Sequence, residues 1–323
     1  MRPLKFHPIL KQTLWGGERI IPYKELASEL SRVGESWELS GMPGSESVVA
    51  EGPWAGSTLS ELIGRFGAEL LGKANYARFG QEFPLLVKFI DAREDLSIQV
   101  HPDDELARKR HGKSGKCEMW YVLEAEPGAS LLTGFSRPIA PAEYERRVAD
   151  NTLTDVLNRQ AIASGDVFYL PAGRVHSIGK GSFIVEIQQS SDITYRIYDF
   201  DRRDAAGNSR ELHTELAREA IDFESSENSR ITYAPENNQE VRLVTTPYFT
   251  TSLYTLTART RCDWSATDSF VAIVLLQGSG SLTDNEGNRI DVRQGETWLL
   301  PASTQWTEIT PHTATLRLLT SRI

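Results

Sequence analysis

Two histidines, a glutamate and a glutamine occupy positions from which they could bind a divalent cation. Gln99 and His101 are two residues apart in the segment LSIQVHP (96–102), so both side chains share one face if this segment is a strand. Glu118 opens an apolar segment further along, and His176 follows an LPAG turn. Two imidazoles, a carboxylate and an amide oxygen form a mixed nitrogen and oxygen donor set that suits zinc or a similar ion. Such a set leaves the ion a position for water or substrate.

The elements that must position these side chains are predicted to be short strands. Apolar runs rich in Val, Ile, Phe and Tyr lie at 83–90, 96–101, 118–123, 130–134, 167–171, 183–189 and 193–198. Runs at this density, separated by turn residues, are typical of an all-β sandwich or barrel. Residues 58–78 and 141–160 show helical spacing of apolar residues behind a capping residue or an N1 proline. We expect two helices there, packed beside the β core.

A polar stretch over 224–240 separates this region from a second strand-rich block. The second block carries apolar runs at 270–276, 280–283, 297–301 and 315–319 and lacks helical periodicity. We therefore expect a larger domain over 1–240, which carries the candidate site, and a smaller β domain over 241–323.

An internal repeat links the two blocks. Residues 165–176 read GDVFYLPAGRVH and residues 295–306 read GETWLLPASTQW, so that His176 falls opposite Trp306. Both copies consist of glycine and an acid, an apolar strand, Leu-Pro-Ala and a turn. The first copy resembles the second motif of the cupin superfamily, whose members are small jelly-roll barrels. The fold predicted is mainly β, with two cupin-type jelly-roll barrels, of which only the first carries metal ligands.

Composition restricts the partners. The 323 residues include 35 basic and 44 acidic side chains, and the net charge of −9 would repel nucleic acid and anionic membranes. An anionic ligand would need a local cluster of cations. The two cysteines, Cys117 and Cys262, form no Cys-x-x-Cys motif, and no apolar run suits a signal peptide or a membrane span. We expect a cytoplasmic protein.

Four longer motifs make the resemblance specific. SIQVHPD (97–103), GKCEMW (115–120), LPAGRVH (170–176) and EIQQSSDITYR (186–196) resemble the successive motifs of type I mannose-6-phosphate isomerase, a zinc-dependent cupin enzyme. WGG (15–17) and GESWE (34–38) are similar to its short bacterial form. The resemblance implies an aldose–ketose isomerase that interconverts D-mannose 6-phosphate and D-fructose 6-phosphate through a cis-enediol. It covers about residues 1 to 220 and makes 1–240 the catalytic domain.

The same resemblance assigns roles to individual residues. It implies one Zn²⁺ per chain and a catalytic arginine at Arg196. Strand alternation independently places Arg196 with Thr194 and Tyr198 on the less apolar face. The implied zinc ligands are Gln99, His101, Glu118 and His176.

Further cations are candidates for catalysis and substrate binding. Lys116 lies two residues before Glu118 and would share its strand face, so we take it as a second catalytic residue. Arg137 and Arg174 are candidates to bind the phosphate of a phosphorylated sugar. The chain has no room for the large helical domain of the longer enzymes, so 141–160 and the Asp-, Arg- and Gly-rich segment 199–210 are candidates to roof the pocket and to hold the phosphate.

Two alternatives belong to other functional classes. A non-catalytic sugar-binding or regulatory cupin would need no intact ligand set, whereas all four positions are filled here. An iron-dependent cupin oxygenase uses a similar His and Glu set, but Lys116 and Arg196 suit an anionic intermediate better than O₂ chemistry. Zinc, manganese and cobalt all tolerate these ligands. The sequence leaves monomer and homodimer equally open.

Overall fold

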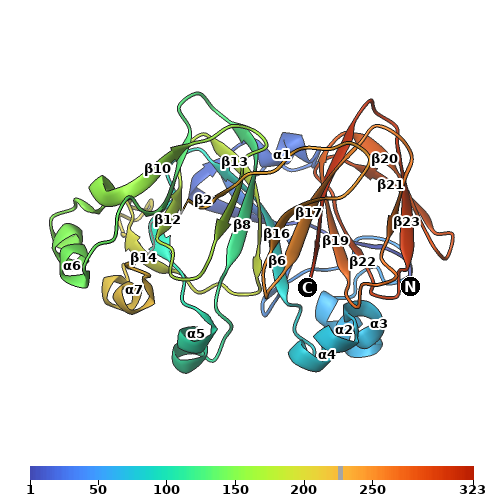
Figure 1. Cartoon of the computed structure of the whole chain (residues 1–323), viewed down its shortest axis with the longest axis horizontal. Helices are drawn as coiled ribbons and strands as arrows, with labels where there is room; N and C mark the ends of the chain where they lie inside the picture. The colour runs from blue at the N-terminus through green and yellow to red at the C-terminus, as the bar shows by residue number, and fades with distance from the viewer. Residues whose placement is uncertain (225–227) are drawn as a thin grey trace.

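Two β-sandwiches lie side by side in the computed structural model, which describes residues 1–224 and 228–323 (Figure 1). The first contains a seven-stranded sheet, in the order β15 (Arg230–Ile231), β11 (Val167–Leu170), β8 (Glu118–Ala125), β13 (Ser182–Gln189), β6 (Leu85–Ala92), β2 (Ile9–Gly17) and β3 (Val33–Leu39). Its second sheet has the order β10 (Leu157–Ala161), β9 (Ser130–Phe135), β12 (His176–Ile178), β7 (Ile98–Val100) and β14 (Tyr195–Tyr198).

The second sandwich has the same plan. Its larger sheet has the order β1 (Leu4–Lys5), β22 (Thr297–Leu300), β19 (Val271–Gln277), β24 (Leu316–Arg322), β17 (Thr250–Leu256) and β16 (Val241–Thr245). Its smaller sheet has the order β18 (Thr260–Asp263), β23 (Trp306–Pro311), β20 (Ser279–Asp284) and β21 (Arg289–Arg293). A separate hairpin joins β4 (Gly41–Met42) and β5 (Ser45–Glu46).

Strand order makes both sandwiches jelly rolls. The orders β11-β8-β13-β6 and β10-β9-β12-β7 in the first recur as β22-β19-β24-β17 and β21-β20-β23-β18 in the second. Strands β6 to β13 therefore match β17 to β24 one for one, in chain order and in pairing. The mainly β fold with two jelly rolls, predicted from the repeat, is confirmed.

One hydrophobic cluster joins the two sandwiches. It includes Val87, Phe89 and Val185 from the first and Phe270 and Leu319 from the second, all buried. Side chains alternate along a strand, so one face of β6 packs against the second sandwich while the other faces the interior of the first. Strands buried on both faces explain the near-continuous apolar runs in the sequence.

Helices lie at the ends of the sandwiches. They are α1 (Ile20–Tyr23), α2 (Leu59–Phe66), α3 (Ala68–Leu71), α4 (Lys73–Phe79), α5 (Asp104–His111), α6 (Pro141–Ala149) and α7 (Thr214–Ala220). The expectation that the two predicted helices pack beside the first sandwich holds for α6, and α5 and α7, which were not predicted, also lie there. It is wrong for α2 to α4, which lie beneath the second (Figure 1), where Ala302 N donates to Leu70 O at 2.9 Å.

Both predicted helices are shorter than the sequence suggested. The 58–78 segment begins with a capping box between Thr58 and Glu61, then breaks at Gly67 and Gly72, whose φ values are +49° and +95°. The 141–160 segment leaves the helix at Ala149, and a single 3₁₀ turn over Leu153–Val156 leads into β10. Pairing with β9 overrides the helical spacing of the apolar residues there.

The proposed division at residue 240 remains a prediction. β15 pairs with β11 and so belongs to the first sandwich, as expected. β1, however, pairs with β22 of the second, so the chain starts in one sandwich and then builds the other. Among the described residues, no helix combines the length and apolar character needed to cross a bilayer.

Candidate metal centre and active-site cavity

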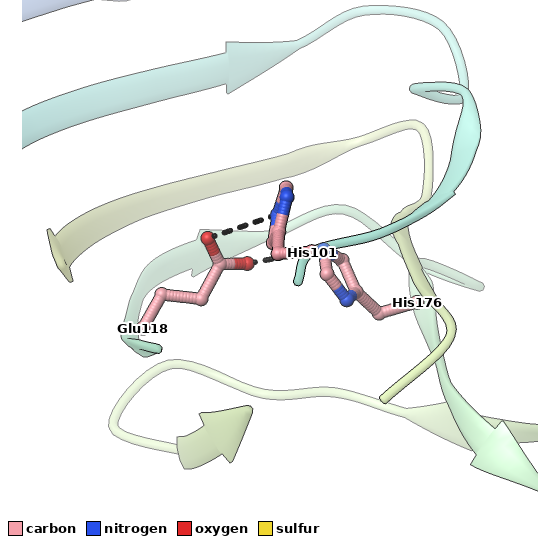
Figure 2. Close-up of side chains that lie close together, drawn as sticks. All are labelled: His101, Glu118 and His176. Atoms are coloured by element: carbon pink, nitrogen blue, oxygen red, sulfur yellow. Dashed lines mark ion pairs between the residues drawn. The ribbon is translucent and has the colours of Figure 1, made fainter. Parts of the chain in front are cut away.

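His101, Glu118 and His176 converge in the first sandwich (Figure 2). All three are buried, and their candidate ligand atoms lie within 4.8 Å of one another. Glu118 is the first residue of β8, His176 is the first of β12, and His101 directly follows β7. The two facing sheets therefore each contribute to the cluster at one end of the sandwich.

Strand register places further polar side chains beside the cluster. His176 is paired across the strands with Gln99, and Gln99 is paired in turn with Arg196. Residues paired in this way project from the same face of a sheet. One row across β12, β7 and β14 thus presents an imidazole, an amide and a guanidinium.

Backbone carbonyls fix the protonation of both imidazoles. His101 Nδ1 lies 2.8 Å from the carbonyl oxygen of Ile193. His176 Nδ1 lies at the same distance, 2.8 Å, from that of Arg174. A carbonyl oxygen can only accept, so each Nδ1 carries a hydrogen, and Nε2 is the atom of each ring that can ligate a metal. Burial, reinforced by the Lys116 charge, lowers the pKa of His101 to about 3, which keeps that ring neutral.

These nitrogen lone pairs face the carboxylate of Glu118. Its oxygens lie 3.5 Å from Nε2 of His101 and 3.2 Å from Nε2 of His176. Neither oxygen accepts a well-oriented hydrogen bond from any described residue. The Lys116 ammonium lies beside one carboxylate oxygen and His101, and gathering the remaining buried acceptors is costly unless a further cation lies among them. The donor set therefore fits a divalent metal ion, and the carbonyl contacts are of the kind that orient histidine ligands.

Lys116 brings a positive charge to the same place. Its Nζ lies 2.8 Å from Oε2 of Glu118 and 3.1 Å from Nε2 of His101. Burial by itself would raise the pKa of Glu118, but the Lys116 ammonium holds this pKa well below its usual value. Glu118 is thus ionised, as a metal ligand must be.

Gln99 adds a fourth donor. Its Nε2 lies 3.3 Å from Nε2 of His176, and a half-turn of the amide presents Oε1 there instead. The Ser97 hydroxyl lies 3.3 Å from the other amide atom and can donate or accept, so it tolerates both orientations. The structure thus brings together all four residues that were predicted to bind the metal.

A cavity of about 170 Å³ opens beside this cluster. Gln99 and Lys116, which contact the histidines, line it. So does Arg196, whose Nη1 donates to the carbonyl oxygen of Glu211 at 2.9 Å. Burial lowers the pKa of Arg196, and the neighbouring Arg210 lowers it further. The two predicted catalytic cations, Lys116 and Arg196, therefore lie on the same cavity.

Arg137 and Arg174 lie elsewhere. Arg137 is half exposed and forms an ion pair with Glu143 of α6 at 2.6 Å. Arg174 is buried, with its side chain against Gly134 and Nη1 3.3 Å from the Ser229 hydroxyl. Neither lines the cavity, so the structure does not bring these two candidates to the metal cluster.

Sequence reasoning missed a buried ion pair in the cavity wall. Lys88 Nζ lies 3.0 Å from Oε1 of Glu186, and Trp120 Nε1 donates to the other oxygen of Glu186 at 3.0 Å. Burial opposes the charge on Lys88, but Glu186 and Glu35 raise its pKa above the ordinary value. The available signal was a charged residue in the middle of each of two apolar runs, LLVKFI (85–90) and FIVEI (183–187).

The N-terminal strands close the far side of the cavity. Thr13 and Trp15 of β2 and Glu35 of β3 line it. Gly34 allows this approach, because a Cβ there would lie 2.1 Å from Thr13 Oγ1 and 2.7 Å from the Trp15 ring. The WGG and GESWE motifs thus adjoin the site, although neither was assigned a role in it.

Two jelly rolls with a His-Glu-His cluster in the first define a metal-binding protein of the cupin class. The family model for the catalytic domain of type I phosphomannose isomerase matches residues 4–132. The mannose-6-phosphate isomerase ManA of Bacillus subtilis is 34% identical over 303 residues, covering 93% of each chain. The Streptococcus mutans mannose-6-phosphate isomerase is 33% identical over 302 residues, covering 93% of this chain and 92% of the relative.

A solved structure agrees over the whole chain. The crystal structure of a mannose 6-phosphate isomerase from Bacillus subtilis superposes with a TM-score of 0.90 at 30% identity and covers 100% of both chains. The chain belongs to the type I mannose-6-phosphate isomerase family.

Proposed function

We propose that the protein interconverts D-mannose 6-phosphate and D-fructose 6-phosphate at the cavity beside His101, Glu118 and His176. The observation that carries the proposal is the buried convergence of these three ligands with Lys116 and Arg196, in a chain of this family. An anionic substrate suits the cations of the cavity better than O₂ does, which favours the isomerase over an oxygenase.

The reaction moves a proton between C1 and C2 of the open-chain sugar through a cis-enediol. Negative charge develops on O1 and O2 as the carbon–hydrogen bond breaks, so groups that stabilise this charge lower the barrier. We infer a zinc ion held by Gln99, His101, Glu118 and His176. When bound, it would act as a Lewis acid on the sugar oxygens.

Lys116 and Arg196 would also stabilise the negative charge that develops on the sugar oxygens. Nζ of Lys116 lies 2.8 Å from Oε2 of Glu118, so its ammonium is positioned beside the metal ligands before substrate arrives. Arg196 is half-buried and fixed through the carbonyl oxygen of Glu211, and a guanidinium stays protonated at any working pH. Both residues therefore suit stabilisation of the developing oxyanion, and Arg196 is a poor candidate for the general base.

Apolar side chains form part of the otherwise polar cavity wall. Trp15, Leu96 and Ile178 line the cavity beside the charged groups. Where these side chains exclude water from the bound sugar, each charge interaction is strengthened and the enediol is protected from unwanted protonation.

Assaying the metal-analysed protein tests the proposal. Purified protein loaded with zinc should convert mannose 6-phosphate to fructose 6-phosphate in a coupled assay. Removing the metal with a chelator should abolish turnover, and adding back zinc should restore it. Parallel loading with manganese, cobalt and iron(II) would rank the metals. Absence of turnover with every metal, at full metal occupancy, would contradict the proposal.

A further inference from the structure

Lys116 lies just before a regular strand. The ladder of β8 begins at Glu118, so the N–H groups of residues 115–117 need acceptors elsewhere. The N–H of Lys116 donates to the carbonyl oxygen of Pro102 at 3.1 Å. The N–H groups of its two neighbours donate to side chains that come from other elements.

Two side chains hold these neighbours. Gly115 N donates to Oδ1 of Asp104 at 2.8 Å. Cys117 N donates to Oε1 of Gln189 at 2.9 Å. The other end of the glutamine amide, Nε2, donates to the same Asp104 oxygen at 3.1 Å. The two side chains thus connect residue 115 to residue 117 around Lys116, and we call them the Gln189–Asp104 clamp.

The glutamine of the clamp is fully used on this segment. Gln189 is 7% exposed, and its own N–H donates to the carbonyl oxygen of Cys117 at 3.1 Å. The contact between Cys117 N and the amide oxygen is buried. A buried N–H that loses its acceptor is costly, so the path of residues 115–117 depends on this side chain.

The aspartate of the clamp is anchored on a helix. Asp104 is the first residue of α5, and Asp103 caps this helix by accepting a hydrogen bond from Leu106 N at 2.8 Å. Gly115 lets the Lys116 segment reach this helix end, because a Cβ there would lie 2.6 Å from Asp104 N. The clamp therefore ties residues 115–117 to a fixed backbone.

The turn between β13 and β14, which contains the clamp glutamine, also holds a candidate metal ligand. The Ser191 hydroxyl donates to the carbonyl oxygen of Ser114 at 2.9 Å. Two residues further on, the carbonyl oxygen of Ile193 contacts Nδ1 of His101. The QQSS part of the EIQQSSDITYR motif, which had no role assigned to it, thus lies where it can align two parts of the site at once.

We propose that Gln189 and Asp104 are positioning residues that hold the Lys116 ammonium in place for the reaction. This inference rests on the proposed function, in which that ammonium stabilises developing negative charge. Lys116 lines the cavity, whereas the described cavity wall includes neither residue of the clamp, so the clamp acts through the backbone. Charge stabilisation depends on preorganisation, and a misplacement of about 1 Å can reduce the rate by roughly 10²-fold.

Substitutions at both ends of the clamp test the proposal. Gln189→Ala removes both amide contacts, and Asp104→Ala removes the acceptor of Gly115 N. Asp104→Asn keeps Oδ1 as an acceptor for both donors, so this conservative variant should retain what Asp104→Ala loses. Ser190→Ala is the matched control, because Ser190 is the next residue of the turn and its N–H, which donates to the carbonyl oxygen of Pro84, is unchanged.

We expect Gln189→Ala and Asp104→Ala to lower kcat for mannose 6-phosphate by roughly 10- to 100-fold, with KM within about twofold of wild type. Asp104→Asn and Ser190→Ala should stay within about threefold of wild type in both constants. Rates are expressed per bound metal ion, so that unfolded chains do not count. Wild-type kcat in both alanine variants of the clamp would overturn the proposal.

A double-mutant cycle shows whether the clamp acts through Lys116. In a Lys116→Gln background, Gln189→Ala should lower kcat by less than about twofold, because the group that it positions is already missing. Single-turnover assays with enzyme in excess keep the slow variants measurable. A loss as large as in the wild-type background would overturn the positioning role and leave Gln189 a purely structural residue.

Hydrogen exchange separates this inference from the proposed function. In the metal-loaded protein without substrate, peptides that contain residues 115–117 should exchange roughly tenfold faster in Gln189→Ala than in wild type, and at the wild-type rate in Ser190→Ala. Unchanged exchange in Gln189→Ala would overturn the clamp, even in an active isomerase. Faster exchange there, in a protein that isomerises no sugar with any metal, would contradict the proposed function and not the clamp.

Discussion

The two jelly rolls share one topology, but their interiors differ in polarity. Glu118 is paired with Leu170, and Val271 is paired with Leu300, the residue at the same place in the second copy of the repeat. Val271 therefore stands where the first sandwich has Glu118. The repeat likewise sets Trp306 against His176.

The other polar positions of the first interior can be matched to the second in the same way. Gln99 is paired with His176, and Asp263 is paired with Trp306, so the second sandwich has an aspartate where the first has the glutamine. By the same register, Ser252 and Thr320 replace the ion pair of Lys88 and Glu186. The rest of the second interior is one apolar cluster: Tyr254, Leu256, Cys262, Trp264, Val271, Ile273, Leu275, Leu282, Ile290, Val292, Trp298, Leu300, Ile309, Leu316 and Leu318.

This comparison separates what the fold needs from what the reaction needs. The second sandwich shows that the topology closes around apolar side chains and a few hydroxyl groups, without counterparts of Glu118 or of the Lys88–Glu186 pair. Burying Lys88, Glu118 and Glu186 in the first adds charges that the fold does not require, and desolvating them costs stability. The polar end of the first interior is therefore best explained by function.

The strongest test removes the residue that distinguishes the two copies of the repeat. His176→Ala should lose its metal and reduce kcat by more than the 10²- to 10³-fold that one preorganised donor typically contributes. Trp306→Phe, at the matching position of the second sandwich, should keep full metal content and activity. Metal analysis and the coupled assay measure both. Wild-type metal content in His176→Ala would remove this residue from the site.

Part of this comparison was accessible from the sequence. The repeat predicts two jelly rolls because its Gly, Leu-Pro-Ala and apolar positions impose the same strand and turn twice. His101, Glu118 and His176 were found because imidazole and carboxylate groups lie on predicted strands, one of them on such a turn, and because their positions match the motifs of a known family. Residue type and spacing suggested the site, and the resemblance assigned its residues.

Other features depended on packing that a local pattern does not contain. Lys88 and Glu186 lie 98 residues apart and meet only through the register of β6 and β13. Arg137 lies close to a strand end in sequence, but Glu143 on the following helix holds it at the surface. The helix expected over 141–160 ended early because β10 pairs with β9. In each case a tertiary contact outweighed a local preference.

Breaking the ion pair of the first interior should reduce stability strongly. Glu186→Gln leaves the Lys88 ammonium buried without its partner, and removal of one member of a buried pair costs about 3 kcal/mol or more. We expect the free energy of unfolding of the metal-loaded protein to fall by about that amount in urea titrations. A loss below about 1 kcal/mol would show that water or Glu35 compensates the charge of Lys88. Burying charges in the first interior would then cost less stability than the comparison implies.

Changing Arg196 should affect catalysis rather than stability. Arg196→Lys keeps a positive charge in the cavity but loses the planar fork and the Nε donor. We expect normal metal content and a kcat lower by roughly 10²-fold, the scale of one donor to a developing oxyanion. The coupled assay at saturating mannose 6-phosphate measures this directly. A variant within about threefold of wild type in both kcat and KM would assign the main charge stabilisation to Lys116 instead.

The smallest expected effect has the opposite sign and lies in the second sandwich. Thr320 occupies the position of Glu186, and its hydroxyl is buried without a hydrogen-bond partner among the described residues. Because the surroundings are apolar and no reaction uses this hydroxyl, Thr320→Val replaces an unsatisfied polar group with a methyl of similar size. We expect the free energy of unfolding to rise by about 1 kcal/mol in urea titrations, since an unpaired buried hydroxyl carries a desolvation penalty of that order. Metal content and kcat should stay at wild-type values. A destabilised Thr320→Val would mean that the hydroxyl has a bound water or another partner, and that the second interior retains a polar position of its own.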